Sequence, residues 1–165
     1  MGTDPNNSMD VIDSRDIITR LDELEGDRDS LQTEVDDKAE ELAQFEHDEG
    51  EKDGPTAKDI TDARQTHQEA VDALEEWKND DGDELNALKE LADEADKTAD
   101  WIHGEQLIRR SHFKDYAQEL AEEIGALDKE DKWPLNCLDW DRAAEELEED
   151  YMEVDFGGVE YLIRC

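Results

Sequence analysis

Apolar residues in the first third of the chain recur at alternating steps of three and four positions. The repeat comprises Ile17, Leu21, Leu24, Leu31, Val35, Leu42 and Phe45. Arg28 and Lys38 occupy the two positions that the repeat skips. This heptad spacing is typical of a helix that packs along one seam against another helix. The stretch from about Asp13 to Glu46 has no proline and one glycine, Gly26, so it predicts a single helix roughly 50 Å long at about 1.5 Å per residue.

A second helix with the same repeat is predicted after a polar loop. Residues 47–55, HDEGEKDGP, hold two glycines and a proline among charged residues, which is typical of an exposed loop. The repeat then continues through Ile60, Ala63, His67, Ala70, Leu74 and Trp77. A short connection lets this helix return antiparallel to the first. The two repeats therefore predict a coiled-coil hairpin, in which the polar His67 fixes the register.

The rest of the chain predicts a third helix and then a small globular domain. The third helix follows a turn at residues 79–83 and carries Leu85, Leu88, Leu91, Ala92 and Ala95 on its apolar face. A further helix has Phe113, Tyr116, Ala117, Leu120, Ala121 and Ile124 on one face. Gly125 can end that helix in a left-handed conformation, and Asp139 can cap the next one. Residues 151–164 alternate in polarity around Gly157 and Gly158, which predicts a β-hairpin.

The predicted fold is mostly α, with an N-terminal antiparallel coiled-coil helical hairpin followed by a small α+β domain of the order ααββ. We expect residues 1–9 to form a disordered leader and residues 10–98 to form the hairpin with its third helix. Residues 99–165 are expected to form the C-terminal domain. The heptad seam fits pairing within one chain or across a homodimer, and its composition does not distinguish the two.

The charge of the chain directs attention to its surface. The chain has 52 Asp and Glu against 17 Lys and Arg, a formal net charge of -35 in 165 residues. A field of one sign costs stability through self-repulsion, so we expect the field itself to be useful. One explanation is a partner whose basic groove normally holds a polyanion, and the other is a salty solution in which acidic surfaces keep proteins soluble. Direct nucleic-acid binding is disfavoured because the charge has the wrong sign.

The motifs that would indicate an enzyme, a metal or a cofactor are incomplete. Residues 155–157 spell DFG, but no glycine-rich loop or HRD segment accompanies them. The acidic run around Gly82 lacks the ligand spacing of a calcium loop. Cys137 and Cys165 have the spacing of neither a zinc site nor a disulfide framework. No nucleophile and base stand together, so we expect no enzyme, no cofactor and no metal site.

The C-terminal third, at roughly residues 100–164, resembles the closing module of the ArdA-like antirestriction proteins of phages and mobile elements. The segments DYAQELAEEIGAL and WPLNCLDWDRAAEELEEDYMEVDFGGVEYLIR carry the resemblance. They are similar in order and spacing to the acidic helix, the second helix and the aromatic hairpin of that module. The front half departs from the family, because it predicts a helical hairpin in place of further α/β modules.

The resemblance also implies which residues contact a partner. Family members imitate the charge pattern of bent duplex DNA and occupy the DNA groove of type I restriction enzymes. The matching acidic positions are Glu119, Glu122, Glu123, Asp139, Asp141, Glu145, Glu146, Glu148, Glu149 and Asp150. The matching aromatic core positions are Tyr116, Trp140, Tyr151, Phe156 and Tyr161.

Charge, repeat and resemblance together predict a phage-encoded acidic DNA mimic that occludes the basic DNA-binding groove of a host defence nuclease or restriction-modification enzyme. A paired hairpin with an acid at about every third position presents roughly one carboxylate per 2 to 2.5 Å, against about one charge per 1.7 Å of duplex DNA. Two alternatives stay open, an acidic coiled-coil adaptor for another host protein and a halophile-adapted scaffold. No apolar run is long enough to span a membrane, so we expect a cytoplasmic protein of the bacterial host cell.

Overall fold

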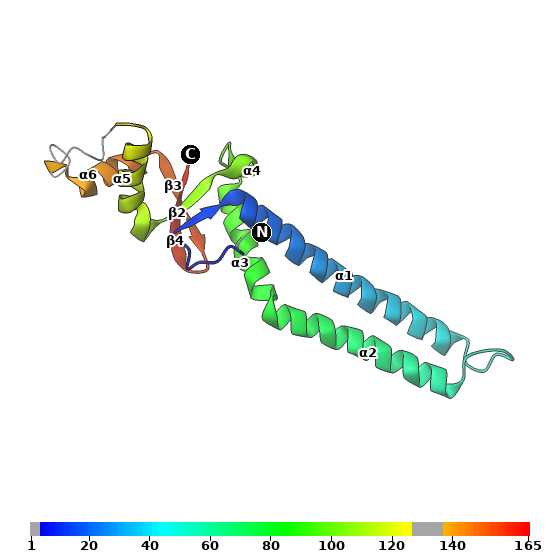
Figure 1. The fold of residues 1–165 in the computed structure, drawn as a ribbon. Coiled ribbons are helices and arrows are strands. Elements are labelled where there is room, and N and C mark those ends of the chain that lie inside the picture. Colours follow the sequence, from blue (N-terminus) through cyan, green and yellow to red (C-terminus); the bar gives the residue numbers. More distant parts are fainter. Residues whose placement is uncertain (1–3, 127–136) are drawn as a thin grey trace. The chain divides into compact units, whose positions relative to one another are not determined.

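The computed structural model describes residues 4–126 and 137–165, which are mostly helical and include a four-stranded antiparallel sheet (Figure 1). The helices are α1 (Ser14–His47), α2 (Ala57–Asp80), α3 (Gly82–Ala95), α4 (Trp101–Gly104), the 3-10 helix η1 (Arg110–His112), α5 (Phe113–Glu123) and α6 (Trp140–Glu148). The strands are β1 (Val11–Asp13), β2 (Gln106–Arg109), β3 (Tyr151–Phe156) and β4 (Val159–Arg164). The predicted mostly helical α+β class is confirmed.

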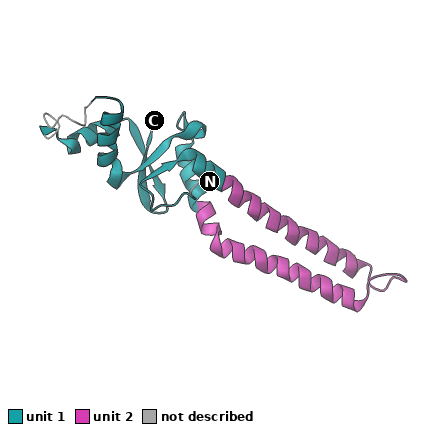
Figure 2. Ribbon diagram, in the orientation of Figure 1, with its two compact units in different colours: residues 1–20, 87–165 teal, residues 21–86 magenta. Residues whose placement is uncertain are grey.

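The chain divides into two compact units (Figure 2). Unit 1 comprises residues 1–20 and 87–165, and unit 2 comprises residues 21–86. The expected boundary after residue 98 therefore differs from the division in the structure. The physical reason is that β1, near the N-terminus, pairs with β2, so the first residues of the chain join the C-terminal sheet.

The sheet of unit 1 has the order β1-β2-β4-β3, and every neighbouring pair is antiparallel. Val11 pairs with Ile108 between β1 and β2, and Leu107 pairs with Ile163 between β2 and β4. The sequence did not predict β1 and β2. Strands of three and four residues are too short to show an alternating pattern, and they exist because partners distant in sequence complete their hydrogen bonds.

The predicted hairpin at residues 151–164 is present as β3 and β4. Gly157 and Gly158 form its two-residue turn, with φ angles of 57° and 83°. Positive φ at both turn residues is the geometry of the type I′ turn, which matches the twist of antiparallel strands and favours glycine. The backbone N–H of Gly158 also donates to Oδ1 of Asp155 at 2.9 Å.

Helices cover both faces of the sheet in unit 1 (Figure 1). On one face, buried residues of β2, β4, α5 and α6 form a cluster of Ile108, Phe113, Ala117, Ala144 and Leu162. Alternation along the strands directs fully buried residues such as Leu107, Tyr161 and Ile163 to the opposite face. There α3 contributes the buried Leu88 and Leu91, and a carboxylate oxygen of its Glu94 accepts a hydrogen bond from the Asp155 backbone N–H of β3 at 3.2 Å.

Residues 4–9, which the sequence analysis assigns to a leader, contact the same sheet. The hydroxyl of Tyr161 donates to the carbonyl oxygen of Met9 at 2.7 Å. The side-chain amide of Asn7 donates to the carbonyl oxygen of Gly157 at 3.2 Å, and Pro5 is buried. These contacts place the segment beside the turn between β3 and β4.

Several helix ends follow the predicted capping chemistry. Gly125, with a φ of 72°, follows α5, and the backbone N–H groups of Gly125 and Ala126 bond back to the carbonyl oxygens of Glu122 and Ala121. The side chain of Asp139 accepts a hydrogen bond from the Arg142 backbone N–H and caps α6. Between these two helices the sequence LDKEDKWPLNC, residues 127–137, predicts a loop, of which residues 127–136 lie outside the described residues.

The helices of unit 2 begin and end close to the predicted positions. α2 starts at Ala57 with Thr56 as its cap, in a capping box with Asp59, so its start lies two residues after Pro55. The predicted turn at residues 79–83 is reduced to Asp81, which alone separates α2 from α3. Among residues 4–126 and 137–165, no helix combines the length and the apolar character needed to cross a membrane.

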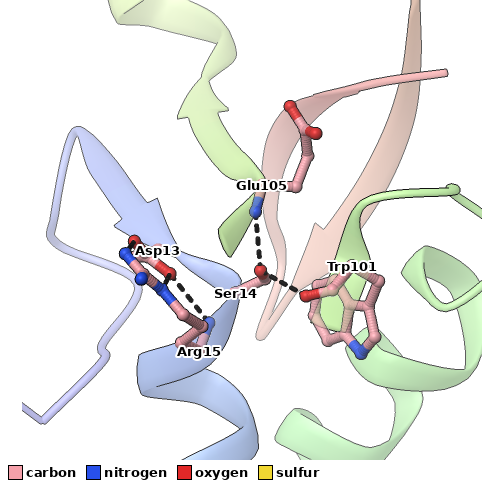
Figure 3. Close-up of polar contacts among 5 residues, drawn as sticks. All are labelled: Asp13, Ser14, Arg15, Trp101 and Glu105. Carbon is pink, nitrogen blue, oxygen red and sulfur yellow. Dashed lines mark hydrogen bonds and ion pairs between the residues drawn. The ribbon is translucent and has the colours of Figure 1, made fainter. Parts of the chain in front are cut away.

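Ser14, the first residue of α1, joins three segments of unit 1 (Figure 3). Its side chain is fully buried. Its Oγ donates to the carbonyl oxygen of Trp101 at 2.6 Å and accepts from the backbone N–H of Glu105 at 2.8 Å. The backbone N–H of Ser14 donates to the carbonyl oxygen of Glu105 at 2.9 Å. One hydroxyl therefore satisfies two backbone groups of the α4 to β2 segment.

An ion pair beside Ser14 supports the start of α1 (Figure 3). Nη2 of Arg15 lies 2.6 Å from Oδ2 of Asp13, and the Arg15 backbone N–H donates to Oδ1 at 2.9 Å. These hydrogen bonds hold the pKa of the Asp13 carboxyl below its ordinary value. Gly104 passes close by with a φ of 103°, and a Cβ there would lie 2.6 Å from Nε of Arg15. The position therefore requires glycine.

Gly26 offers a test of helix propensity in α1. It lies inside the helix, it is exposed, and a Cβ at this position would meet no atom within 4 Å. Because alanine loses less backbone freedom than glycine when a helix forms, we expect Gly26→Ala to raise the stability of the helices of unit 2 by about 0.5–1 kcal/mol. Thermal unfolding followed by circular dichroism at 222 nm measures the gain. An unchanged or lower transition would contradict the assignment of Gly26 to an unstrained helix interior.

Candidate acidic interaction surface

The ten acidic residues that the resemblance implies lie on α5, on α6 and on the residues flanking α6. Glu119, Glu122 and Glu123 belong to the second half of α5, and the other seven lie between Asp139 and Asp150. Glu122 and Glu148 are half-buried, and the remaining eight are exposed. α5 and α6 pack together through the cluster around Phe113, so the structure brings the two groups onto neighbouring helices.

At least four of these ten carboxylates already have partners within unit 1. Asp139 caps α6 through the Arg142 backbone N–H, and Glu146 pairs with the Arg142 side chain at 3.1 Å. Asp141 pairs with Lys114 of α5 at 2.7 Å, and Glu148 pairs with Arg110 at 2.9 Å. The hydrogen bond that the Lys114 ammonium donates to the Asp141 carboxylate raises the pKa of Lys114 above its ordinary value. These four carboxylates therefore help to hold the fold.

Five carboxylates of the group are exposed and have no ion pair with any described residue. They are Glu119, Glu123, Glu145, Glu149 and Asp150. An exposed carboxylate without a basic neighbour contributes its full charge to the surrounding field. Within the predicted set, these five are the best candidates for contact with a basic partner.

Arg110 is the centre of an acidic cluster that the sequence pattern did not indicate. Its guanidinium pairs with Glu148 of α6, with Glu153 of β3 and with Glu160 of β4. The nearby negative charges, Glu148 first among them, raise the pKa of Arg110. An open hollow of about 490 Å³ beside it is lined by Arg109, Ser111 and residues of the β3–β4 turn. The cluster therefore links α6, β3 and β4 of unit 1 through the guanidinium of Arg110.

The predicted aromatic core separates into two groups. Tyr116 and Tyr151 pack against the cluster around Phe113, with their hydroxyl oxygens 3.2 Å apart. Phe156 and Tyr161 form the other group, with ring centroids 6.4 Å apart. Burial raises the pKa of the Tyr151 and Tyr161 hydroxyls, so both remain protonated hydrogen-bonding groups at neutral pH. Trp140, the fifth predicted aromatic, is half-buried in the first turn of α6.

Unit 2 shows that the heptad positions are the covered positions. On α1, the apolar repeat from Leu21 to Phe45 and the skipped positions Arg28 and Lys38 are all buried or half-buried. On α2, the buried or half-buried seam residues are Ile60, Ala63, His67, Ala70, Leu74 and Trp77. α1 and α2 run in opposite directions within unit 2 (Figure 2). Each helix thus covers one stripe, and most of the remaining positions are exposed.

An ion pair identifies one flank of these stripes. Nη2 of Arg64 lies 2.6 Å from Oε1 of Glu46, and joins the start of α2 to the end of α1. Arg64 follows the seam residue Ala63, and Glu46 follows the seam residue Phe45. The positions that directly precede the seam residues consequently lie on the opposite flank of each helix.

The opposite flank carries a row of carboxylates on each helix, here called the acidic rows. On α1 the row comprises Glu23, Asp27, Glu34, Asp37 and Glu41, and on α2 it comprises Asp59, Asp62, Glu69, Glu76 and Asp80. All ten residues are exposed. Neither row contains a lysine or an arginine, although Lys38 reaches Glu41 from the seam at 2.9 Å. One flank of each helix within unit 2 therefore carries only acidic and uncharged residues.

The charge density of unit 2 is close to that of DNA. Residues 21–86 contain 25 Asp and Glu against 6 Lys and Arg, a net charge of -19. Residues 21–47 of α1 span about 40 Å at the rise of an α-helix, so unit 2 presents roughly one net negative charge per 2 Å. Duplex DNA carries about one per 1.7 Å. The predicted site residues omitted these rows, although the heptad repeat already placed their members beside the seam.

Comparison with protein-family models, with curated proteins and with solved structures gave no significant match. Within residues 4–126 and 137–165, histidine, cysteine and acidic side chains form no group that could hold a metal ion.

Proposed function

We propose that this chain is a phage-encoded acidic DNA mimic that occludes the basic DNA-binding groove of a host defence nuclease or restriction-modification enzyme. The observation that carries the proposal is the row of exposed carboxylates along each of the two helices of unit 2. A charge density near that of duplex DNA suits a groove that is lined with lysine and arginine. The exposed carboxylates of α5 and α6 extend the same chemistry to unit 1.

Occlusion follows from charge and not from base recognition. Carboxylates can replace phosphates as partners of basic side chains, but they offer no base edges to read. Inhibition is therefore general among enzymes whose grooves have a suitable shape. Long-range attraction raises the association rate, and salt weakens it because screening acts within a Debye length of about 8 Å at physiological ionic strength.

We also propose that α1 and α2 form an antiparallel coiled coil. The covered stripes follow the heptad repeat on both helices, and Glu46 and Arg64 occupy matching positions beside their seams. In an antiparallel pair, flanking residues at equivalent heptad positions face each other across the seam. The ion pair of Glu46 with Arg64 fits that pattern. The coiled coil makes the two acidic rows neighbours on one surface.

An adaptor function is less well supported by the exposed apolar residues. Among residues 4–126 and 137–165, the large apolar side chains with high exposure are Ile102, Ile124 and Leu138. Ile102 lies in α4, Ile124 directly follows α5 and Leu138 directly precedes Asp139. Single exposed apolar residues are normal on a protein surface. A protein-binding adaptor would offer a contiguous apolar patch.

The test is displacement of DNA from purified defence enzymes. Fluorescence anisotropy follows a labelled duplex bound to a type I restriction enzyme, a type II endonuclease or an RNA-guided nuclease while this chain is added. We expect the chain to displace the duplex from at least one enzyme, with an apparent affinity that falls at least tenfold between about 50 mM and about 200 mM salt. Failure to displace the duplex from every enzyme at low salt would contradict the proposal.

Two variants with the same change in charge separate the contributing surfaces. The row variant carries Asp27→Asn, Glu34→Gln, Asp62→Asn, Glu69→Gln and Glu76→Gln. The module variant carries Glu119→Gln, Glu123→Gln, Glu145→Gln, Glu149→Gln and Asp150→Asn. We expect the apparent affinity for the defence enzyme to fall more in the row variant than in the module variant, because the residues changed in the row variant belong to the acidic rows. An equal loss in both would show that only net charge matters, as for a halophile-adapted scaffold.

A further inference from the structure

The covered stripe of unit 2 has little apolar material to hold its helices together. The buried residues of unit 2 are Leu24, Ile60, Ala63, Ala70 and Leu74 on α1 and α2 and Leu85 on α3, and two of them are alanines. The half-buried seam positions include Arg28, Lys38 and His67. Polar seam residues specify pairing at a cost in stability, and an alanine buries much less apolar surface than a leucine. Close packing therefore contributes weakly in unit 2.

Repulsion opposes the pairing of the same helices. Five of the eight neighbouring pairs in the acidic rows are three or four residues apart, for example Glu34, Asp37 and Glu41, which is about 5 Å along the helix, and the other three pairs are seven residues apart. Like charges at this spacing destabilise a helix. The Debye length is about 30 Å at 0.01 M salt and about 3 Å at 1 M, so the neighbours repel strongly at the first concentration and weakly at the second.

Trp77 adds a group that the paired state leaves unsatisfied. Its indole Nε1 is buried and has no acceptor among the described residues. An unpaired buried donor costs free energy that is recovered when water can reach it. Opening of the structure around Trp77 would expose this N–H to water.

Unit 1 differs in every one of these respects. Large residues such as Tyr161, Ile163 and Leu107 are fully buried, and strand pairing links segments far apart in the chain. Arg110 neutralises part of the acidic cluster around it. Burial and hydrogen bonding thus stabilise unit 1 with much less dependence on the surrounding ions.

We propose that cations control the pairing of α1 with α2, so that unit 2 opens at low ionic strength while unit 1 stays folded. Mobile counterions or a polycation close the pair by lowering the repulsion between the acidic rows. This proposal does not depend on the proposed function, because simple salts are sufficient to show it. It makes unit 2 an element whose order responds to the basic charge around it.

Hydrogen exchange followed by mass spectrometry tests this on the full chain, because its peptides report on the two units separately. We expect exchange in residues 21–80 to slow at least tenfold between about 10 mM and about 1 M NaCl, while residues 106–109 and 151–164 change little. Spermidine at about 1 mM is expected to reproduce the slowing at low salt. In thermal unfolding, the transition of unit 2 should rise by about 10 to 20 °C over the same range of salt.

The row and module variants provide matched controls. The row variant should be protected at low salt and should lose most of its response to salt, whereas the module variant should respond as the unaltered chain does. Equal salt dependence of exchange in both units would overturn the proposal. So would a row variant that retains the full salt response, because the repulsion would then arise elsewhere.

Discussion

Replacement of Phe113 by alanine is expected to lower the free energy of unfolding of unit 1 by about 3–5 kcal/mol. Phe113 is 2% exposed and belongs to the cluster between the sheet and the pair α5 and α6. Its ring lies edge-on to that of Tyr151, with centroids 4.9 Å apart, and 5.7 Å from that of Tyr116. Alanine removes both aromatic contacts and leaves a cavity. The neighbouring helices cannot fully close this cavity.

Urea unfolding in about 1 M NaCl measures this loss, with near-ultraviolet circular dichroism as the signal of the aromatic cluster. Ile102→Ala is the control, because that side chain is 69% exposed and its truncation should change stability by less than about 0.5 kcal/mol. A Phe113→Ala protein within about 1 kcal/mol of the unaltered chain would show that the cluster does not hold α5 on the sheet.

Ser14→Ala is expected to cost unit 1 about 2–4 kcal/mol, although it removes a single oxygen atom. The hydroxyl is the partner of the Trp101 carbonyl oxygen and of the Glu105 backbone N–H, and the site is fully buried. Both backbone groups would lose the hydrogen bond to this hydroxyl at a site that solvent does not reach. Each buried group that is left without this partner lowers the free energy of unfolding by about 1–3 kcal/mol. The effect is large because one side chain serves two partners.

Ser30→Ala is the matched control for Ser14→Ala. Ser30 lies in the same helix and is exposed, and alanine favours helix formation, so the control should be neutral or slightly stabilising. Urea unfolding of the three proteins under identical conditions gives the comparison. If Ser14→Ala behaved like Ser30→Ala, the two hydrogen bonds would contribute nothing measurable to the stability of unit 1.

The sequence predicted the elements whose information is local. The helix expected from about Asp13 to Glu46 is observed as α1, Ser14–His47, because a heptad repeat sustained over many turns fixes both its length and its covered face. Asp139 caps α6, Gly125 ends α5 and Gly157 begins the tight turn, since each of these roles depends on the residue itself and on its immediate neighbours.

The missed features depend on residues far apart in the chain. β1 and β2 bring together Ile12 and Leu107, and neither segment has a pattern of its own strong enough to indicate a strand. The role of Ser14 also depends on distant residues, because its hydroxyl forms hydrogen bonds with the backbone of Trp101 and Glu105. Sequence periodicity contains no information about such pairings.

The candidate site was predictable in kind but not in position. Charge alone indicated an acidic interaction surface, yet Asp141, Glu146 and Glu148 of the predicted set pair with basic residues of unit 1. Which carboxylates remain without an ion pair depends on where Arg110, Lys114 and Arg142 lie after folding. The heptad repeat already placed the members of the acidic rows beside the seam, and the pair of Glu46 and Arg64 identified the opposite flank.

The pairing of β1 with β2 has a consequence for the order of events during synthesis. β1 ends at Asp13, whereas β2 begins at Gln106, so at about 5–20 residues per second β1 waits on the order of 10 s for its partner. Helices form within about a microsecond, so α1 and α2 have time to form locally during this interval. On the ribosome, Ile12 therefore remains without its partner Leu107 until the second half of the chain has emerged, and the sheet assembles after α1 and α2 have formed.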